Sequence, residues 1–164
     1  MTPKPALVLG LHPTSRGFGW IVFAGPDAPV DWGAAEMSGD KNARILMRIE
    51  ALLTTYKPRV LVLESPAKGP TKGRSSRVKR LFNAIVKRAK AIQIHVYTRD
   101  QIQQSFAGAQ TREEIAAAVA NRVSVLRDRW KGPRKIWIGE QHEMGLFCAA
   151  ACVLTYYTQL QNPA

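Results

Sequence analysis

Short apolar runs alternate with segments of helical periodicity along this chain, an order typical of α/β proteins. Apolar residues run from Leu7 to Leu11 and from Val60 to Leu63. Runs this short are typical of strands buried on both faces of a sheet. Three further strands are predicted, near 19–24, near 30–37 and, from its alternating apolar positions, over 92–97.

Apolar residues three and four positions apart predict helices in the intervening segments. The predicted helices span 41–56, 76–91, 99–106, 111–129 and 140–159. Thr111, followed three residues later by Glu114, is typical of a capping box at a helix start. The order of elements predicts one α/β domain over residues 1–164, with a five-stranded mixed sheet flanked by helices.

The composition agrees with a folded protein and excludes a membrane-spanning segment. Hydrophobic residues make up 46% of the 164 residues, but no apolar run approaches the ~18 residues that cross a bilayer. The N-terminus lacks the features of a signal peptide, so a cytoplasmic protein with no membrane partner is expected. Cys148 and Cys152, four residues apart in a helical segment, are expected to be core residues, and no zinc-ligand spacing is present.

The net charge of +12 favours a polyanionic partner, above all nucleic acid. Basic residues gather without any acidic residue between Lys68 and Lys90, in a loop and the helix after it, and a second basic group lies beside Trp130. A solvated helix face and a core tryptophan are the alternatives. The residues predicted to contact nucleic acid are Lys68, Lys72, Arg74, Arg77, Lys79, Arg80, Lys87, Arg88, Trp130, Lys131, Arg134 and Lys135.

Two strands end on ionisable residues. His12 follows the first apolar run and Glu64 follows the run from Val60. Open α/β sheets build their sites at the carboxyl ends of such strands, so both residues are candidate site residues. The alternatives are a surface glutamate and a histidine with a structural role.

Four segments resemble the RuvC-type Holliday junction resolvases of the RNase H-like superfamily. Residues 9–15 resemble the family's Gly-Ile/Leu-Asp-Pro-Gly opening, and residues 59–64 resemble its fourth strand, which ends on a catalytic glutamate. Residues 104–114 resemble its Val-x-Gly-x-Gly-x-x-x-Lys segment, and residues 140–143 resemble the acidic pair before its last helix. The resemblance implies an RNase H-like fold.

The resemblance also implies a metal-dependent nuclease. In this family four carboxylates hold two divalent cations that activate water and stabilise the leaving oxygen of a phosphodiester. The matching positions here are His12, Glu64, Glu140 and Glu143, with His12 in place of the first aspartate. Because Mg²⁺ prefers oxygen ligands, His12 should weaken Mg²⁺ binding more than Mn²⁺ binding, or act as a general base.

The last helix can be aligned in two registers. In one, Glu140 and Glu143 replace the family's aspartate pair. In the other, His142 matches a His-x-x-Asp pattern, and Gly145 stands where the metal-binding aspartate belongs. The second register removes two carboxylates and predicts an inactive site.

Two functions follow as alternatives. One is a RuvC-like endonuclease with an atypical metal site that cleaves branched or structured DNA, and the other is a RuvC-like DNA-binding module without nuclease activity. An RNA substrate is a third possibility. The segment 65–69 lacks the aromatic residue that the family inserts at the junction centre. The resemblance alone implies a homodimer.

Overall fold

The structure is a computed structural model that describes residues 5–14, 16–66, 74–130 and 143–162. Five strands form one mixed sheet in the order β3-β2-β1-β4-β5. β1 pairs antiparallel with β2, and β2 with β3, whereas β4 is parallel to both β1 and β5. The strands are β1 (Val8–Pro13), β2 (Gly17–Phe23), β3 (Pro29–Glu36), β4 (Val60–Glu64) and β5 (Gln93–Tyr97).

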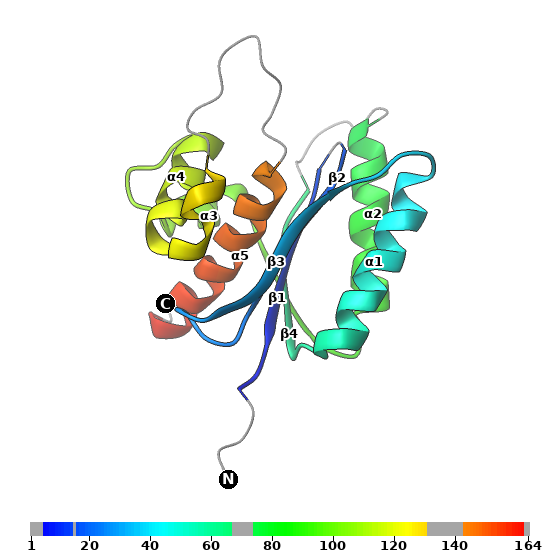
Figure 1. Ribbon diagram of the computed structural model, residues 1–164, viewed down its shortest axis with the longest axis horizontal. Helices are drawn as coiled ribbons and strands as arrows, with labels where there is room; N and C mark the ends of the chain where they lie inside the picture. Colours follow the sequence, from blue (N-terminus) through cyan, green and yellow to red (C-terminus); the bar gives the residue numbers. More distant parts are fainter. Residues whose placement is uncertain (1–4, 15, 67–73, 131–142, 163–164) are drawn as a thin grey trace.

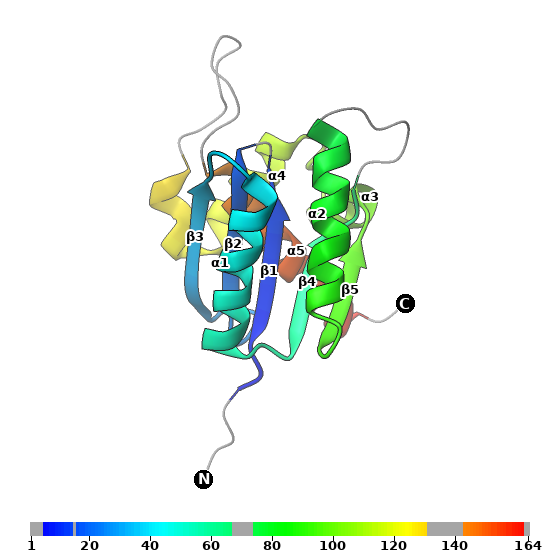
Figure 2. The same ribbon diagram turned by 90° about the vertical axis from the view of Figure 1, so that its right-hand side faces the viewer.

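Helices cover both faces of the sheet, as Figure 1 and the perpendicular view in Figure 2 show. Two helices pack on one face, and the others lie on the opposite face. The first pair is α1 (Lys41–Tyr56) and α2 (Arg74–Arg88). The second group is α3 (Arg99–Gln104), α4 (Arg112–Arg122), the 3₁₀ helix η1 (Ser124–Arg129) and α5 (Met144–Gln161).

The sheet separates two hydrophobic cores. Side chains alternate along a strand, so even-numbered residues of β1 and β4, such as Val8 and Val62, belong to the core under α5. Leu9 and Leu63 belong to the core under α1 and α2. This alternation explains why the central strands read as continuous apolar runs in the sequence.

α5 lies so close to β1 that only glycine fits beneath it. A Cβ atom on Gly10 would lie 2.5 Å from Val153 Cγ2 and 2.7 Å from the Ala149 carbonyl oxygen. The helix is buried from Met144 to Tyr157, and Cys148 and Cys152 are buried free thiols. The predicted role of both cysteines in the core is thus confirmed.

The predicted fold class is confirmed, with differences at helix boundaries. The helix predicted over 111–129 is two elements, because α4 ends at Arg122 and Val123 adopts an extended conformation before η1. The run of β-branched residues and serine around Val123 has low helix propensity. Within the described ranges, no helix combines the length and apolar character that crossing a membrane requires.

Candidate functional site

The two ionisable residues at strand ends lie at the same edge of the sheet. Leu11 of β1 is the register partner of Leu63 of β4, and the next residues along these parallel strands are His12 and Glu64. By alternation, both lie on the face of the sheet that α5 covers, as Val62 does. Each residue thus lies at the carboxyl end of a central strand, as expected from the sequence, whereas its role in a site stays a prediction.

Glu64 forms an ion pair with Arg99, the first residue of α3. Glu64 Oε2 accepts a hydrogen bond from Arg99 Nη2 at 3.1 Å, and the Glu64 side chain is only 13% exposed. Burial raises the pKa of Glu64, against the opposing effect of Arg99 and Arg112. The arginines thus stabilise the carboxylate form of a buried acid.

His12 lies deeper at the end of β1. Its Nδ1 atom is buried and has no hydrogen-bond partner among the described residues. Burial, with smaller effects of the Arg112 and Arg99 charges, lowers the pKa of His12 from 6.5 to about 3. The imidazole is therefore neutral at physiological pH.

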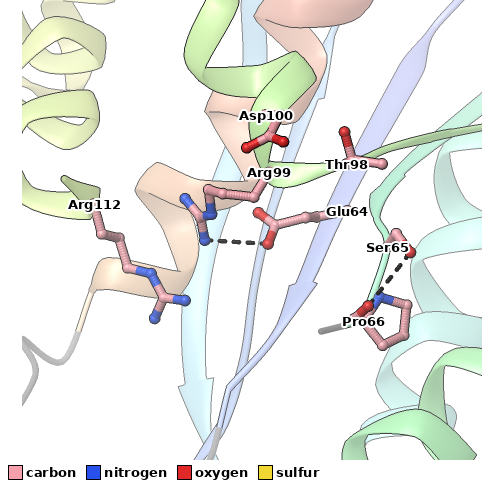
Figure 3. A pocket seen from close by; sticks show the side chains of 7 residues that line it. All are labelled: Glu64, Ser65, Pro66, Thr98, Arg99, Asp100 and Arg112. Atoms are coloured by element: carbon pink, nitrogen blue, oxygen red, sulfur yellow. Dashed lines mark hydrogen bonds and ion pairs between the residues drawn. The ribbon is translucent and has the colours of Figure 1, made fainter. Parts of the chain in front are cut away.

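A cavity of about 400 Å³ opens beside this pair of strand ends. Figure 3 shows Arg99 reaching to Glu64 and Arg112 reaching from the start of α4 toward the same space. The cavity carries two guanidinium groups, two carboxylates and two hydroxyl groups. Its lining residues are Glu64, Ser65, Pro66, Thr98, Arg99, Asp100 and Arg112.

Two acidic residues at the start of the last helix, Glu140 and Glu143, were predicted to belong to the site. Of these, only Glu143 is described, and it does not line this cavity. Glu143 is at the N-cap position of α5 without a side-chain capping bond, and its Oε1 atom accepts a hydrogen bond from Arg129 Nη1 at 2.8 Å. Glu140 and His142 lie outside the described residues. Gly145 packs against β2, because its Cβ position is only 2.9 Å from the Gly19 nitrogen.

The described residues do not fit a site for two divalent cations. Such a site needs several carboxylates whose charge is not already compensated. Here Arg99 and Arg112 balance the charges of Glu64 and Asp100 in the cavity. No group of three or more histidine, cysteine, aspartate or glutamate residues in the described ranges could hold a metal ion.

The basic residues predicted to contact nucleic acid fall into three structural situations. Arg77 binds the protein itself, because it donates from Nη1 to Asn42 Oδ1 and from Nη2 to the Thr14 carbonyl oxygen. Arg88 forms a 2.6 Å ion pair with Glu50. Arg80 and Lys87 are exposed on α2, and Lys79 is partly buried.

The remaining members of this group are less completely described. Trp130 packs edge-on against Phe147, with ring centroids 5.6 Å apart. This contact favours a role for Trp130 at the margin of the core over a contact with nucleic acid. Arg74 begins α2, and its side chain is not among those described. Lys68, Lys72, Lys131, Arg134 and Lys135 lie outside the described residues.

Sequence reasoning missed Arg99 and Arg112 as site residues. Arg99 follows the end of β5, and β5 is the parallel neighbour of β4. The sequence did carry a signal for Arg99: it is a basic residue just after β5, and the carboxyl ends of neighbouring parallel strands meet at one edge of the sheet. Arg112 lies inside the segment 104–114, which resembles the family's lysine-containing segment.

Known structures share the fold of this chain over nearly its whole length. Thermus thermophilus RuvC, solved in complex with a Holliday junction substrate, is 19% identical with a TM-score of 0.73, and the match covers 96% of each chain. The yeast mitochondrial Holliday junction resolvase is 12% identical with a TM-score of 0.62, and the match covers 99% of this chain and 83% of that one.

The fowlpox virus resolvase, solved with its substrate Holliday junction DNA, is 12% identical with a TM-score of 0.54 and covers 94% of this chain and 98% of its own. Comparison with protein-family models and with curated protein sequences found no match. The chain therefore has the fold of the RuvC-type resolvases, and the RNase H-like fold class predicted from the sequence is confirmed.

Proposed function

We propose that this chain, which has the fold of the RuvC-type resolvases, is a RuvC-like protein that binds branched DNA. One observation carries the proposal: the fold matches that of a resolvase solved on a Holliday junction over 96% of both chains. The DNA would run across the sheet edge where β1 and β4 end. Arg80, an exposed basic residue of α2, supports that placement, whereas Lys87 lies in the last turn of α2, toward the opposite edge of the sheet (Figure 2).

The charge of the protein supports the same proposal. A net charge of +12 would attract the phosphate backbone, and each neutralised phosphate releases condensed counterions. Affinity should therefore fall steeply with salt concentration. Preference for a four-way junction over duplex DNA would have to come from shape, because phosphate contacts position a protein on DNA without reading its sequence.

A competition experiment tests this function. Binding of a fluorescent four-way junction is measured in EDTA while unlabelled junction, duplex DNA and structured RNA compete. The junction should compete best, by about tenfold or more over duplex, as expected for a specific over a nonspecific site. Equal competition by all three would contradict a branched-DNA function, and best competition by RNA would favour the RNA alternative.

Metal-dependent endonuclease activity is the second candidate function. Two observations favour it: Glu64 ends β4 where the resemblance places a catalytic glutamate, and the buried His12 Nδ1 atom has no hydrogen-bond partner among the described residues, so it is open to a metal ion. Against it, Arg99 and Arg112 already balance the charges of Glu64 and Asp100 in the cavity, which disfavours a metal site and so favours binding without cleavage. Mg²⁺ or Mn²⁺ would be the cofactor, with Glu140 and Glu143 as the further ligands predicted from the sequence and His142 as a further candidate catalytic residue.

Incubation of the labelled junction with Mg²⁺, and separately with Mn²⁺, distinguishes the two functions. Symmetric nicks that disappear in Glu64→Gln would establish the endonuclease. Tight binding without nicks in either metal would establish the binding function alone.

A homodimer belongs to the same proposal. A four-way junction offers two symmetric positions, and a twofold dimer presents the same surface to each of them. Sedimentation of the free protein, and of its complex with the junction, gives the stoichiometry. Two chains for each junction are expected, and a single chain would contradict this part of the proposal.

A further inference from the structure

The ion pair between Glu64 and Arg99 gives the strand-end cavity a cation of its own. In the related folds the glutamate at the end of the fourth strand is expected to face a metal ion. Here Arg99 Nη2 lies 3.1 Å from Glu64 Oε2. Both side chains are partly buried, at 13% exposed for Glu64 and 30% for Arg99, so solvent screens this pair only in part.

We propose that the Arg99 guanidinium takes the place of a metal ion, so that the cavity binds a phosphate group of the DNA backbone without a divalent cation. This inference rests on the proposed DNA-binding function and names the contact that the sheet edge makes with its ligand.

The geometry of a guanidinium suits this role. It carries five N–H donors in a rigid planar fork, so one donor can hold the Glu64 carboxylate while others point at a phosphate oxygen. Figure 3 shows Arg99 between Glu64 and Arg112, with its head group in the cavity. The second guanidinium, on Arg112, lines the same space.

The other groups of the cavity complete a site for an anion. Thr98 and Ser65 contribute hydroxyl groups to the lining; Ser65 Oγ donates to the Pro66 carbonyl oxygen, and Thr98 Oγ1 accepts from Gln101 N, which leaves its own O–H free to donate. The cavity volume of about 400 Å³ can admit a backbone phosphate with its flanking sugars. Glu64 and Asp100 offset the charges of Arg99 and Arg112, so a phosphodiester competes with these carboxylates for the guanidinium N–H donors.

The neutral state of His12 agrees with the positive charge that Arg99 and Arg112 bring to this end of the sheet. Its low pKa follows from burial and from the charges of Arg112 and Arg99, so the positive potential of both guanidiniums reaches the end of β1. An aspartate at position 12 would hold a metal ion or pair with these arginines. A neutral imidazole carries no negative charge that could pair with the two arginines.

The inference is tested by the metal dependence of binding and by two opposite substitutions. Junction affinity is measured by fluorescence anisotropy in EDTA and in Mg²⁺. Arg99→Gln removes the cation, and Arg122→Gln, at the exposed last residue of α4, removes the same charge away from the cavity. Thermal melting confirms that each variant is folded.

We expect wild-type affinity to agree within about twofold in the two buffers, and Arg99→Gln to weaken binding by about tenfold more than Arg122→Gln, as a lost charged hydrogen bond predicts. Glu64→Gln should strengthen binding in EDTA, because it removes the carboxylate that competes for Arg99. Equal losses in the two arginine variants, binding that requires Mg²⁺, or weaker binding by Glu64→Gln would each overturn the inference.

A probe without DNA separates this inference from the proposed function. Inorganic phosphate and dimethyl phosphate are titrated into the ¹⁵N-labelled protein, and amide shifts of residues 64–66 and 98–100 are followed. Saturable shifts there that vanish in Arg99→Gln support the phosphate site even if junction and duplex compete equally. Junction binding without any such shift would leave the DNA function in place and overturn the phosphate site.

Discussion

Gly145, in the first turn of α5, lies directly against Gly19 of β2. A Cβ atom on Gly19 would be 2.0 Å from the Gly145 carbonyl carbon, and one on Gly145 would be 2.8 Å from Thr14 Cγ2. Real Cβ atoms do not approach other atoms this closely, so the contact requires glycine on both sides. In the second register of the last helix, this position belongs to a metal-binding aspartate. The structure leaves no room for one.

Substitution of Gly145 should therefore destabilise the fold rather than restore a metal ligand. Gly145→Ala and Gly145→Asp should each lower the free energy of unfolding by about 1–3 kcal/mol, the range for overpacked cores. Urea denaturation measures the loss. Gly25→Ala is the control, because the nearest heavy atom to its Cβ position is 3.9 Å away. Wild-type stability in Gly145→Ala would show that α5 can move away from β2.

Arg77 and Arg80 should separate structural from DNA-binding roles within one helix. Arg77 Nη2 lies 3.0 Å from the Thr14 carbonyl oxygen and Nη1 lies 2.8 Å from Asn42 Oδ1, so it ties α2 to the β1–β2 turn and to α1. Arg77→Gln should cost about 1–3 kcal/mol of unfolding free energy through lost charged hydrogen bonds.

Arg80 is exposed, and its Nη1 atom donates to Ser76 Oγ on the same helix. Arg80→Gln should leave stability within about 0.5 kcal/mol. If Arg80 contacts a phosphate, the variant lowers the slope of log affinity against log salt by about 0.9. Denaturation and a salt titration of junction binding measure both effects. An unchanged salt slope would remove Arg80 from the DNA-binding surface.

The sequence predicted the sheet and its strand ends but not the partner of Glu64. Strands were predictable because both faces are covered, so each central strand is a continuous apolar run with a polar residue at its end. The pairing of Glu64 with Arg99 depends on the placement of β5 beside β4, which joins residues 35 positions apart. No local pattern encodes that contact, and the same holds for the closure of α5 on Gly19.

His12 should make stability depend on pH in the acid range. Its pKa is lowered from 6.5 to about 3 in the folded protein, so between these values the unfolded chain binds one proton more than the folded chain. The contribution of His12 is therefore fully present above about pH 6.5 and is lost as the pH falls toward 3. Between about pH 6.5 and pH 4.5 the loss is on the order of 2 kcal/mol.

Comparison of the wild type with His12→Asn isolates this contribution. Glu64, whose pKa is raised, has the opposite effect, because the folded protein binds its proton more readily as the pH falls. Glu64 is present in both proteins, so its effect cancels in the difference. Urea midpoints at about pH 7 and about pH 4.5 should therefore differ less in His12→Asn than in the wild type. Equal differences would show that His12 is protonated in the folded state.

Restoration of an aspartate at position 12 should not by itself restore metal binding. His12→Asp would place a carboxylate near the charges of Arg99 and Arg112, which already lower the pKa of His12. The new carboxylate would pair with these guanidiniums, since a nearby fixed cation needs no dehydration as Mg²⁺ does. Calorimetric titration with Mg²⁺ and Mn²⁺ should therefore show no gain in affinity for the single variant.

His12→Asp combined with Arg99→Gln frees two carboxylates and should bind Mn²⁺ measurably. His12→Asp combined with Arg122→Gln is the charge-matched control. Mg²⁺ binding by the single variant, equal to that of the double variant, would show that Arg99 does not occupy the metal position.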